Sequence, residues 1–262
     1  MHVQDILDSF YGAGQEQNRF STKHGFIEFF ITTSYIERYL KRGDRILEVG
    51  CGTGAYTLHY AHQGYEVDAI DLVEANLAVL QQNMRSADRV RAVQGNALDL
   101  SQYVDQTFDI TLLLGPMYHL YTTNEKLQCL QEALRVTKTG GILFVAYCQF
   151  DASMIQAGFI RHLYDDLVEK KLLDTQWFLP ISNPEGIFEL YRKEQIDALN
   201  EKLNCQRLHY VGTDMFSHYY EEEIDSMEDT LYQNYIAYTA SICENEHLVG
   251  VSNHSLDVLQ RY

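Results

Sequence analysis

The chain has 262 residues, of which 46% are hydrophobic and 22% are charged, a composition typical of a folded globular protein rather than a disordered one. Its 37 acidic and 20 basic residues give a formal net charge of -17, which disfavours nucleic acid and anionic membranes as partners. The five cysteines form no CxxC pair and no run reaches the roughly 18 apolar residues of a membrane span, so we expect a cytoplasmic protein with free thiols.

In chain order, the first predicted element is an amphipathic helix at residues 25–40, whose apolar face would cover a sheet. Between residues 45 and 148, short apolar runs alternate with helix-like segments, which is typical of βαβ units around a parallel sheet. The predicted strands are residues 45–49, 65–70, 89–94, 108–114 and 141–148. The helix before the last of these strands is expected to have Asn124 as its N-cap and Gly140 with Gly141 as its stop signal.

The pattern changes after the fifth predicted strand. Residues 149–205 are more polar and aromatic, and they predict helices near 153–172 and 190–203 without a sheet of their own. A segment of this length at the carboxyl edge of a strand is typical of a lid or substrate-binding cap, with a helical buttress that touches no ligand as the alternative. A strand at 206–212, an acidic helix at about 219–243 and a strand at 254–262 complete the pattern.

The first predicted strand runs into a glycine-rich turn, RILEVGCGTGA at residues 45–55. Gly50, Gly52 and Ala55 fit the loose G-x-G-x-x-G/A pattern of loops that hold the pyrophosphate of a dinucleotide. A carboxylate at Glu48 would repel a pyrophosphate but would accept hydrogen bonds from a cationic amino group. Asp71 ends the second strand, where an acidic side chain accepts both ribose hydroxyls of either kind of cofactor. The loop therefore fits a nucleoside cofactor with an amino group better than it fits NAD.

The chain resembles the class I S-adenosylmethionine-dependent methyltransferases in four motifs that follow the family's order. LEVGCGTG resembles the first motif, AIDL the acidic motif of the second strand, GNALDL the adenine-side motif and LRVTKTGGILFVAY the fifth-strand motif. The resemblance implies S-adenosyl-L-methionine as cofactor and S-adenosyl-L-homocysteine as product. The cofactor-binding residues that it implies are Tyr11, Arg19, Glu48, Gly50, Gly52, Gly54, Asp71, Leu72, Asn96, Ala97, Leu114 and Gly115.

The same resemblance assigns a part of the cofactor to each of these positions. Glu48 and the glycines would face the methionine portion, Asp71 the ribose, Leu72 the adenine face, and Asn96 with Ala97 the adenine edge. Many relatives have Asp where Asn96 stands, but the Asn carbonyl oxygen can also accept a hydrogen bond from the adenine amino group. In similar methyltransferases the N-terminal segment, here residues 10–25, folds over the methionine end. Arg19 is therefore a candidate partner of the cofactor carboxylate, with a surface arginine as the alternative.

With the resemblance, the elements predict an α/β fold: a Rossmann-like, doubly wound, mostly parallel seven-stranded sheet with helices on both faces and a helical lid insertion. The cofactor-binding core would comprise residues 1–148 and 206–262, with covering helices in 1–44, and the lid would comprise 149–205. The oligomeric state is not indicated by the sequence.

The fourth predicted strand runs into GPMYHLYT, residues 115–122, at the edge where the reactive methyl group would lie. This stretch contains neither the N-P-P-Y type tetrapeptide of adenine and glutamine methylases nor the Pro-Cys nucleophile of cytosine methylases. It resembles menaquinone- and ubiquinone-pathway methyltransferases and relatives that act on small metabolites, so a small-molecule acceptor is predicted. Tyr118 and His119 are the candidate catalytic residues that would take a proton from the attacking atom. Because neighbours on a helix diverge, only one of them is expected to face the acceptor.

Several other residues are secondary candidates. Tyr147 and Asp151 follow the same edge, with a core position as the alternative for Tyr147, and His209 is expected to be a hydrogen-bonded core histidine. Trp177, Phe178 and Phe188 of the insertion could form an aromatic wall around the acceptor and the sulfonium. No metal ligand is predicted. Two rival functions stay open, a nicotinamide-dependent oxidoreductase and a non-catalytic nucleoside-binding module, and the sequence does not indicate which acceptor atom would be methylated.

Overall fold

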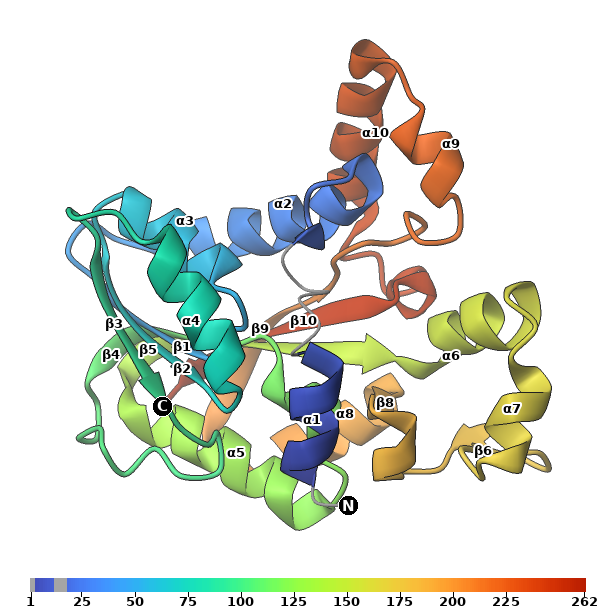
Figure 1. Cartoon of the computed structure of the whole chain (residues 1–262), viewed down its shortest axis with the longest axis horizontal. Helices are drawn as coiled ribbons and strands as arrows, with labels where there is room; N and C mark the ends of the chain where they lie inside the picture. Colours follow the sequence, from blue (N-terminus) through green and yellow to red (C-terminus); the bar gives the residue numbers. More distant parts are fainter. Residues whose placement is uncertain (1–2, 12–17) are drawn as a thin grey trace.

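The structure is a computed structural model that describes residues 3–11 and 18–262. Its centre is an eight-stranded sheet with the order β3-β2-β1-β4-β5-β10-β9, in which β8 pairs with β5 outside this path (Figure 1). The strands are β1 (Arg45–Val49), β2 (Glu66–Asp71), β3 (Arg89–Gln94), β4 (Phe108–Leu113), β5 (Thr137–Gln149), β8 (Leu190–Tyr191), β9 (Cys205–Gly212) and β10 (His254–Arg261).

Strands β1 to β5 pair in parallel, and β10 is antiparallel to both β5 and β9. The seven predicted strands are all present, and the doubly wound, mostly parallel α/β fold is confirmed. The strand order reverses at β1, which has β2 on one side and β4 on the other. In such sheets the loops at the carboxyl ends of the two central strands diverge and leave a crevice between them.

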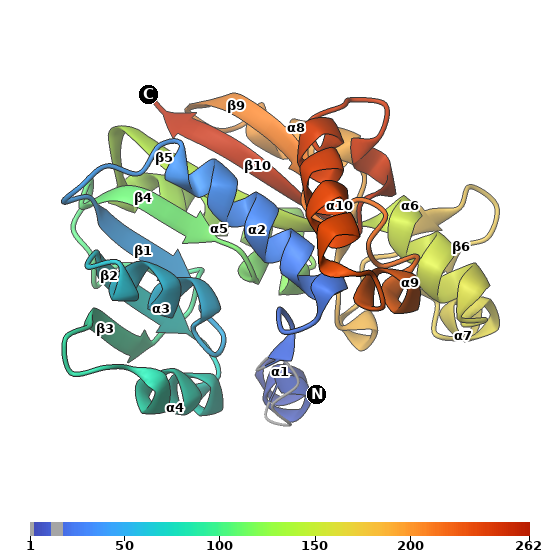
Figure 2. The same cartoon turned by 90° about the horizontal axis from the view of Figure 1, so that it is seen from above.

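Helices cover both faces of the sheet, because its central strands are apolar on both sides. One face packs against α2 (Lys23–Glu37), α3 (Ala55–His62) and α10 (Asp229–Ile242), as Figure 2 shows from above. The other face packs against α5 (Thr123–Val136) and α8 (Lys193–Asn200). At the β2–β3 end, α4 (Glu74–Asn83) packs Leu77 and Leu80 against Ala69.

Two helix boundaries differ from the sequence-based prediction for local reasons. Helix α5 has Thr122 rather than Asn124 as its N-cap, because Thr122 and Glu125 form a reciprocal capping box. The helix ends at Val136, and the backbone passes directly into β5. Gly140 and Gly141 therefore lie inside a long strand and do not stop the helix.

The insertion contains helices and strands together. It comprises α6 (Phe150–Ser153), the π-helix η3 (Met154–Ile160), α7 (Tyr164–Glu169), the hairpin β6 (Leu173–Asp174) with β7 (Leu179–Pro180), η4 (Pro184–Gly186), β8 and α8. The helical pattern predicted near 153–172 is present as η3 and α7, which are separated by a break at His162, whose φ is +58°. The expectation that the insertion lacks a sheet of its own is wrong, because β6 pairs with β7. The acidic helix predicted at 219–243 is likewise divided into α9 (Glu221–Asp225) and α10, and η5 (Val249–Val251) precedes β10.

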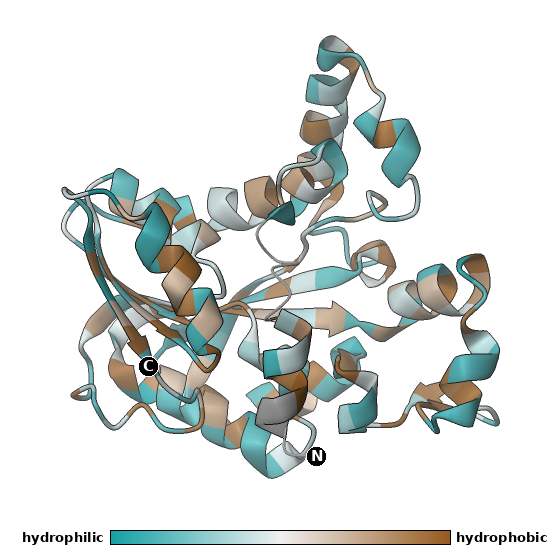
Figure 3. Cartoon of the chain, viewed as in Figure 1, coloured by the Kyte–Doolittle hydropathy of each residue, from teal (hydrophilic) through white to brown (hydrophobic). Residues whose placement is uncertain are grey.

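Apolar residues follow the strands and the inner faces of the helices, but they also reach the outlying hairpin β6–β7 (Figure 3). Trp177, Phe178 and Leu179 of this hairpin are exposed. Across residues 3–11 and 18–262, no helix combines the length and the apolar character that crossing a bilayer takes.

Candidate functional site

A cavity of about 530 Å³ lies at the carboxyl ends of β1, β2, β3 and β4. Its walls are the loops after these strands, the 3₁₀ helix η2 (Pro116–His119) and the N-terminal helix α1 (Val3–Tyr11). The structure brings eleven of the twelve predicted cofactor residues to this cavity: Tyr11, Arg19, Glu48, Gly50, Gly52, Asp71, Leu72, Asn96, Ala97, Leu114 and Gly115. The location is the one that strand order dictates for a ligand in a doubly wound sheet.

The three glycines of the first loop meet different requirements. All have positive φ, and a Cβ on Gly54 would lie only 2.4 Å from a Leu80 side-chain carbon, so Gly54 serves the packing of α4 and does not line the cavity. A Cβ on Gly50 would lie 2.6 Å from Pro116. A Cβ on Gly52 would meet nothing within 4 Å and would project into open space. Gly52 is thus the position where a ligand backbone can approach the loop closely.

Asp71, at the end of β2, holds the glycine loop in place as well as lining the cavity. Its Oδ2 accepts a hydrogen bond from the Gly52 N–H at 2.7 Å, and its Oδ1 accepts from the Val73 N–H at 2.9 Å and from Asn76 Nδ2 at 3.1 Å. Burial raises the pKa of Asp71, although these donors oppose the shift. The carboxylate therefore fixes the loop geometry before any ligand binds.

Glu48 is a buried carboxyl group in the same wall, and the Thr57 hydroxyl donates to it. Burial raises the pKa of Glu48 to about 8, and the nearby charge of Asp71 adds to this effect against the opposing Thr57 bond. Near neutral pH the side chain is therefore largely protonated when no cation lies beside it. A cationic group at the cavity wall would favour its ionised form.

Tyr118 and His119 both line the cavity, which wraps around the end of η2 so that adjacent side chains of the short helix reach it. The Tyr118 hydroxyl is buried and, among the described residues, has no hydrogen-bond partner. Burial raises the pKa of Tyr118 well above 10. Tyr118 therefore keeps its proton near neutral pH and is suited to donating a hydrogen bond, not to removing a proton.

His119 has the complementary character. Its Nδ1–H donates to the Ile187 carbonyl at 2.9 Å, so its Nε2 is the acceptor and receives the Tyr11 hydroxyl at 2.7 Å. Burial lowers the pKa of His119, which keeps the ring neutral near pH 7. A basic lone pair thus points toward α1 at the rim of the cavity. The Phe188 ring lies 5.6 Å from both the His119 ring and the Phe10 ring, so the insertion meets α1 at this point.

The remaining predicted residues have other contacts. Arg19 lines the cavity, but its Nη2 binds both carboxylate oxygens of Glu28, at 2.7 and 2.8 Å. Asp151 is held by Arg192 at 2.7 and 2.9 Å, and Tyr147 is a buried core residue. The predicted N-terminal segment 10–25 includes residues 12–17, which lie outside the described residues.

His209 and the aromatic residues of the insertion also differ in part from the prediction. His209 is hydrogen-bonded, to Tyr39 at 2.7 Å and to Glu244 at 2.5 Å, but it is only partly buried. Of the three aromatic residues expected around the acceptor, Phe188 packs against His119. Trp177 and Phe178 are exposed and do not line the cavity.

One group of polar residues was not identified from the sequence. Asp214, His218 and His254 lie beside Glu28 behind the wall formed by Arg19 and Tyr118. Burial opposes ionisation of Asp214, but its hydrogen bond and charge interaction with His254 hold its pKa at about 2. Asp214 and His218 are one helical turn apart in sequence, which was the only local signal of their proximity.

Comparisons with known proteins agree with the position of this cavity. Residues 46–141 match a protein-family model described as a methyltransferase domain. Demethylmenaquinone methyltransferase of Renibacterium salmoninarum is 37% identical over 105 residues, which are 40% of this chain and 41% of that protein. A Methanocaldococcus jannaschii protein provisionally named a ribosomal RNA large subunit methyltransferase is 31% identical over 91 residues, 32% of this chain and 24% of that protein. The chain spans less than half the length of the curated relatives it matches.

A solved structure resembles the whole chain. It is a Thermotoga maritima S-adenosylmethionine-dependent methyltransferase, described as a possible histamine N-methyltransferase. It superposes with a TM-score of 0.64 at 17% identity, and the match covers 100% of both chains. At this identity the likeness concerns the fold. The glycine loop and Asp71 both lie in the segment that the family model matches.

Proposed function

We propose that the chain transfers a methyl group from S-adenosyl-L-methionine to a small-molecule acceptor, because residues 46–141 match a methyltransferase-domain family model and the fold resembles that of a solved S-adenosylmethionine-dependent methyltransferase. The observation that carries the proposal is one continuous cavity. It is lined by the residues proposed to bind the cofactor, such as Gly52 and Asp71, and also by Tyr118 and His119. A nicotinamide-dependent oxidoreductase and a non-catalytic module are disfavoured by the family match and by this second, polar end of the cavity.

The residues at the glycine loop fit the cofactor that the family uses. Because Gly52 has no Cβ and nothing else lies within 4 Å of that position, a ligand can approach the loop there. Glu48 offers a carboxyl group that would become ionised beside the amino group of the cofactor. Asp71 is bound by backbone donors on both oxygens, and Oδ2, which accepts the Gly52 N–H, keeps a lone-pair direction for a ribose hydroxyl. In this proposal, Asn96 and Ala97 contact the adenine edge. When bound, the cofactor supplies a methyl group that its sulfonium charge has activated.

The contribution of the chain to the reaction is then mainly alignment. Holding the acceptor atom in line with the methyl group can supply roughly 7 to 11 kcal/mol of the barrier reduction, and a general base about 10²- to 10⁴-fold, roughly 3 to 5 kcal/mol. We assign the role of general base to His119, whose ring is neutral and whose Nε2 carries the free lone pair of the imidazole. To act as a base, Nε2 must exchange its hydrogen bond from the Tyr11 hydroxyl for one from the acceptor. Tyr118 would orient the acceptor by donating its hydroxyl proton to a hydrogen bond.

Charge and enclosure support a small acceptor. A net charge of -17 disfavours a polyanionic substrate, and α1 encloses the cavity with Leu7 and Tyr11, the latter beside His119. The names of the relatives do not decide between the two acceptor classes, since one relative is named for demethylmenaquinone, a small molecule, and another for ribosomal RNA.

The test is incubation of the protein with labelled S-adenosylmethionine and a fractionated metabolite extract, followed by mass detection of any compound that gains one methyl group. We expect transfer to one small-molecule fraction, and a fall of about 10²- to 10⁴-fold in turnover for His119→Ala with unchanged cofactor affinity. Transfer to ribosomal RNA and not to any small fraction would contradict the proposed acceptor class.

A thermal-shift measurement tests the cofactor independently of the acceptor. S-adenosylhomocysteine at about 100 times its dissociation constant should stabilise the folded state by about 2.7 kcal/mol, whereas NADH should leave the melting temperature unchanged. Stabilisation by NADH alone would favour the oxidoreductase.

A further inference from the structure

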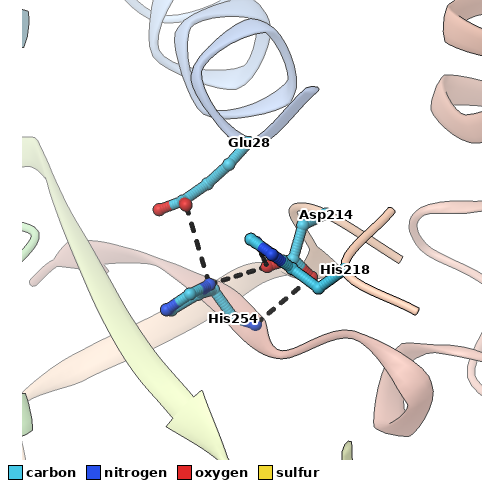
Figure 4. A group of neighbouring side chains, drawn as sticks. All are labelled: Glu28, Asp214, His218 and His254. Atoms are coloured by element: carbon cyan, nitrogen blue, oxygen red, sulfur yellow. Dashed lines mark hydrogen bonds and ion pairs between the residues drawn. The ribbon is translucent and has the colours of Figure 1, made fainter. Parts of the chain in front are cut away.

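Four side chains from three separate parts of the chain converge behind the cavity wall. Glu28 comes from α2, Asp214 and His218 from the segment between β9 and α9, and His254 from the start of β10 (Figure 4). Each offers one nitrogen or carboxylate oxygen, and these four atoms all lie within 4.8 Å of one another. Glu28 and Asp214 are buried, and the two histidines are partly buried. Two buried carboxylates in one pocket require a positive partner.

We propose that Glu28, Asp214, His218 and His254 form a binding site for one divalent transition-metal ion of the zinc type. This inference goes beyond the proposed function and does not depend on it. It also departs from the sequence, which indicated no metal ligand because the four residues are far apart along the chain.

Two of the three separations between these atoms match a tetrahedral ion. Zinc–nitrogen and zinc–oxygen bonds of about 2.0–2.2 Å place neighbouring tetrahedral ligands about 3.3–3.6 Å apart. His254 Nδ1 lies 3.6 Å from Glu28 Oε2, and His218 Nε2 lies 3.4 Å from Asp214 Oδ2. The third pair, His254 Nδ1 and Asp214 Oδ2, is hydrogen-bonded at 2.6 Å, so an ion must replace that proton and move the two atoms apart. Imidazole and carboxylate together suit a borderline divalent ion such as Zn²⁺ better than Ca²⁺ or Mg²⁺, which prefer oxygen alone.

The outer partners of His218 are those of a metal-binding histidine. Its Nδ1 faces Glu221 Oε1 at 3.3 Å, while its Nε2 faces the cluster. Among the described residues, that buried Nε2 has no hydrogen-bond partner. A carboxylate on one ring nitrogen and an ion on the other is the usual arrangement around protein-bound zinc.

The carboxylates are oriented in the same way. Asp214 Oδ1 accepts from the Asn253 N–H at 2.8 Å and from the Ser252 hydroxyl, which leaves Oδ2 directed at the two histidines. Glu28 accepts from Arg19 Nη2 on both oxygens, at 2.7 and 2.8 Å, so an ion at Oε2 would share that oxygen with Arg19. Arg19 Nη2 also lies 3.3 Å from His254 Nε2, so the competing account is that Arg19 alone balances the buried carboxylates. The two accounts differ in whether the site takes up an ion.

A closed set of four protein ligands is typical of an ion that holds a structure together. Here the ion would join α2, the segment after β9 and the start of β10 beside Arg19 and Tyr118, both of which line the cavity. We therefore expect the ion to bind without cofactor or acceptor and to raise the melting temperature of the chain.

The test uses the full chain after removal of metal with a chelator and desalting. Titration with ZnCl₂ by calorimetry, with elemental analysis of the product, should show one tightly bound ion per chain. His218→Ala should lower the affinity for Zn²⁺ by about 100-fold or more, and Glu221→Gln by about 10- to 100-fold. His247→Ala, which removes an 84% exposed surface imidazole, is the matched control and should bind Zn²⁺ as the wild-type chain does.

Either of two results would overturn the proposal: no saturable binding of Zn²⁺, or binding that His218→Ala leaves unchanged. A thermal melt of each metal-free variant shows whether that variant folds. If His218→Ala does not fold, Glu221→Gln, which changes a partly exposed residue, still tests the site. Because S-adenosylhomocysteine binding is measured on the same samples, a failed metal site is distinguishable from a failed methyltransferase assignment.

Discussion

Glu48 links the stability of the fold to pH. Its pKa of about 8 lies above the ordinary carboxyl value of about 4.5, so between these pH values the native state holds a proton that the unfolded state has lost. Stability should therefore fall as pH rises from about 4.5 to 8, by up to about 5 kcal/mol for a fully buried group. Urea unfolding from pH 5 to 8 should show this decline in the wild type and a flatter profile in Glu48→Gln. Glu246→Gln, on the surface, should follow the wild type; equal slopes for all three proteins would show that Glu48 ionises normally.

The same carboxyl group should make cofactor binding depend on pH. If the amino group of S-adenosylhomocysteine binds ionised Glu48, binding lowers the pKa of Glu48 and releases a proton. Affinity should then rise nearly tenfold per pH unit between pH 6 and 7.5. Calorimetry in buffers of different ionisation enthalpy measures the released proton. Glu48→Gln should bind more weakly and without this pH dependence, and a pH-dependent Gln variant would place the titrating group elsewhere.

Substitutions at Gly52 and Gly140 can distinguish the effect of backbone strain from the effect of ligand contact. Gly52→Ala places a side chain at φ +52°, which costs about 1–2 kcal/mol, and its Cβ projects into the cavity. Gly140→Ala imposes similar strain at φ +76°, also with nothing within 4 Å, at an exposed position of strand β5. Both variants should melt at lower temperature, but only Gly52→Ala should lose affinity for S-adenosylhomocysteine, by at least about tenfold. An equal loss in both variants would remove Gly52 from the binding site.

Between elements, a buried ion pair fastens the second half of the insertion to α5. Lys126 Nζ lies 2.5 Å from Glu189 Oε1, with side chains only 11% and 6% exposed, and the Glu189 N–H donates to the Tyr118 carbonyl. Lys126→Met should cost about 3–5 kcal/mol because it leaves a buried carboxylate without its cation. Adding Glu189→Leu should recover most of this loss.

Chemical denaturation of the two single variants and the double variant measures this coupling. Lys193→Met, which breaks an exposed pair with Asp197, is the control and should cost less than about 1 kcal/mol. A similarly small loss for Lys126→Met would mean that the pair does not anchor the insertion. The lid prediction for residues 149–205 stays a prediction.

How far the sequence predicts each element depends on how local the signal is. The apolar runs of β1 to β5 and the glycine loop are contiguous, so their positions and their shared edge follow from pattern alone. The predicted N-cap of α5 was wrong because Thr and Asn are both favourable N-cap residues. Glu125, which completes a capping box with Thr122, decides between Thr122 and Asn124. The strand β8 of the insertion was not predicted, because it forms only by pairing with the distant strand β5. The cluster around His254 could not be predicted, since β10 enters the sheet beside β5 only in the folded topology.

At the scale of the whole molecule, the charge of -17 sets the expected response to nucleic acid. Labelled duplex RNA should show no saturable binding by fluorescence anisotropy at 50 mM salt, while S-adenosylhomocysteine binding in the same sample reports that the protein is intact. An enzyme that neutralises six or more phosphates would instead bind at 50 mM salt and lose about 10³- to 10⁵-fold in affinity by 200 mM. Such a salt-dependent response would favour the RNA-directed relatives over the small-molecule proposal.

The position of β10 in the sheet also has a consequence for how the protein is made. Strand β9 does not pair with β5, because β10 lies between them and forms hydrogen bonds with both. During synthesis, β1 to β5 can assemble as soon as residue 149 has left the ribosome, but β9 must wait for its partner strand β10 until residue 261 follows. The nascent chain therefore passes through a stage in which the methyl-donor half is formed and Asp214 and His218 have no His254 to meet. A ribosome stalled before residue 254 would display the residues that line the cavity without the complete cluster behind Arg19 and Tyr118.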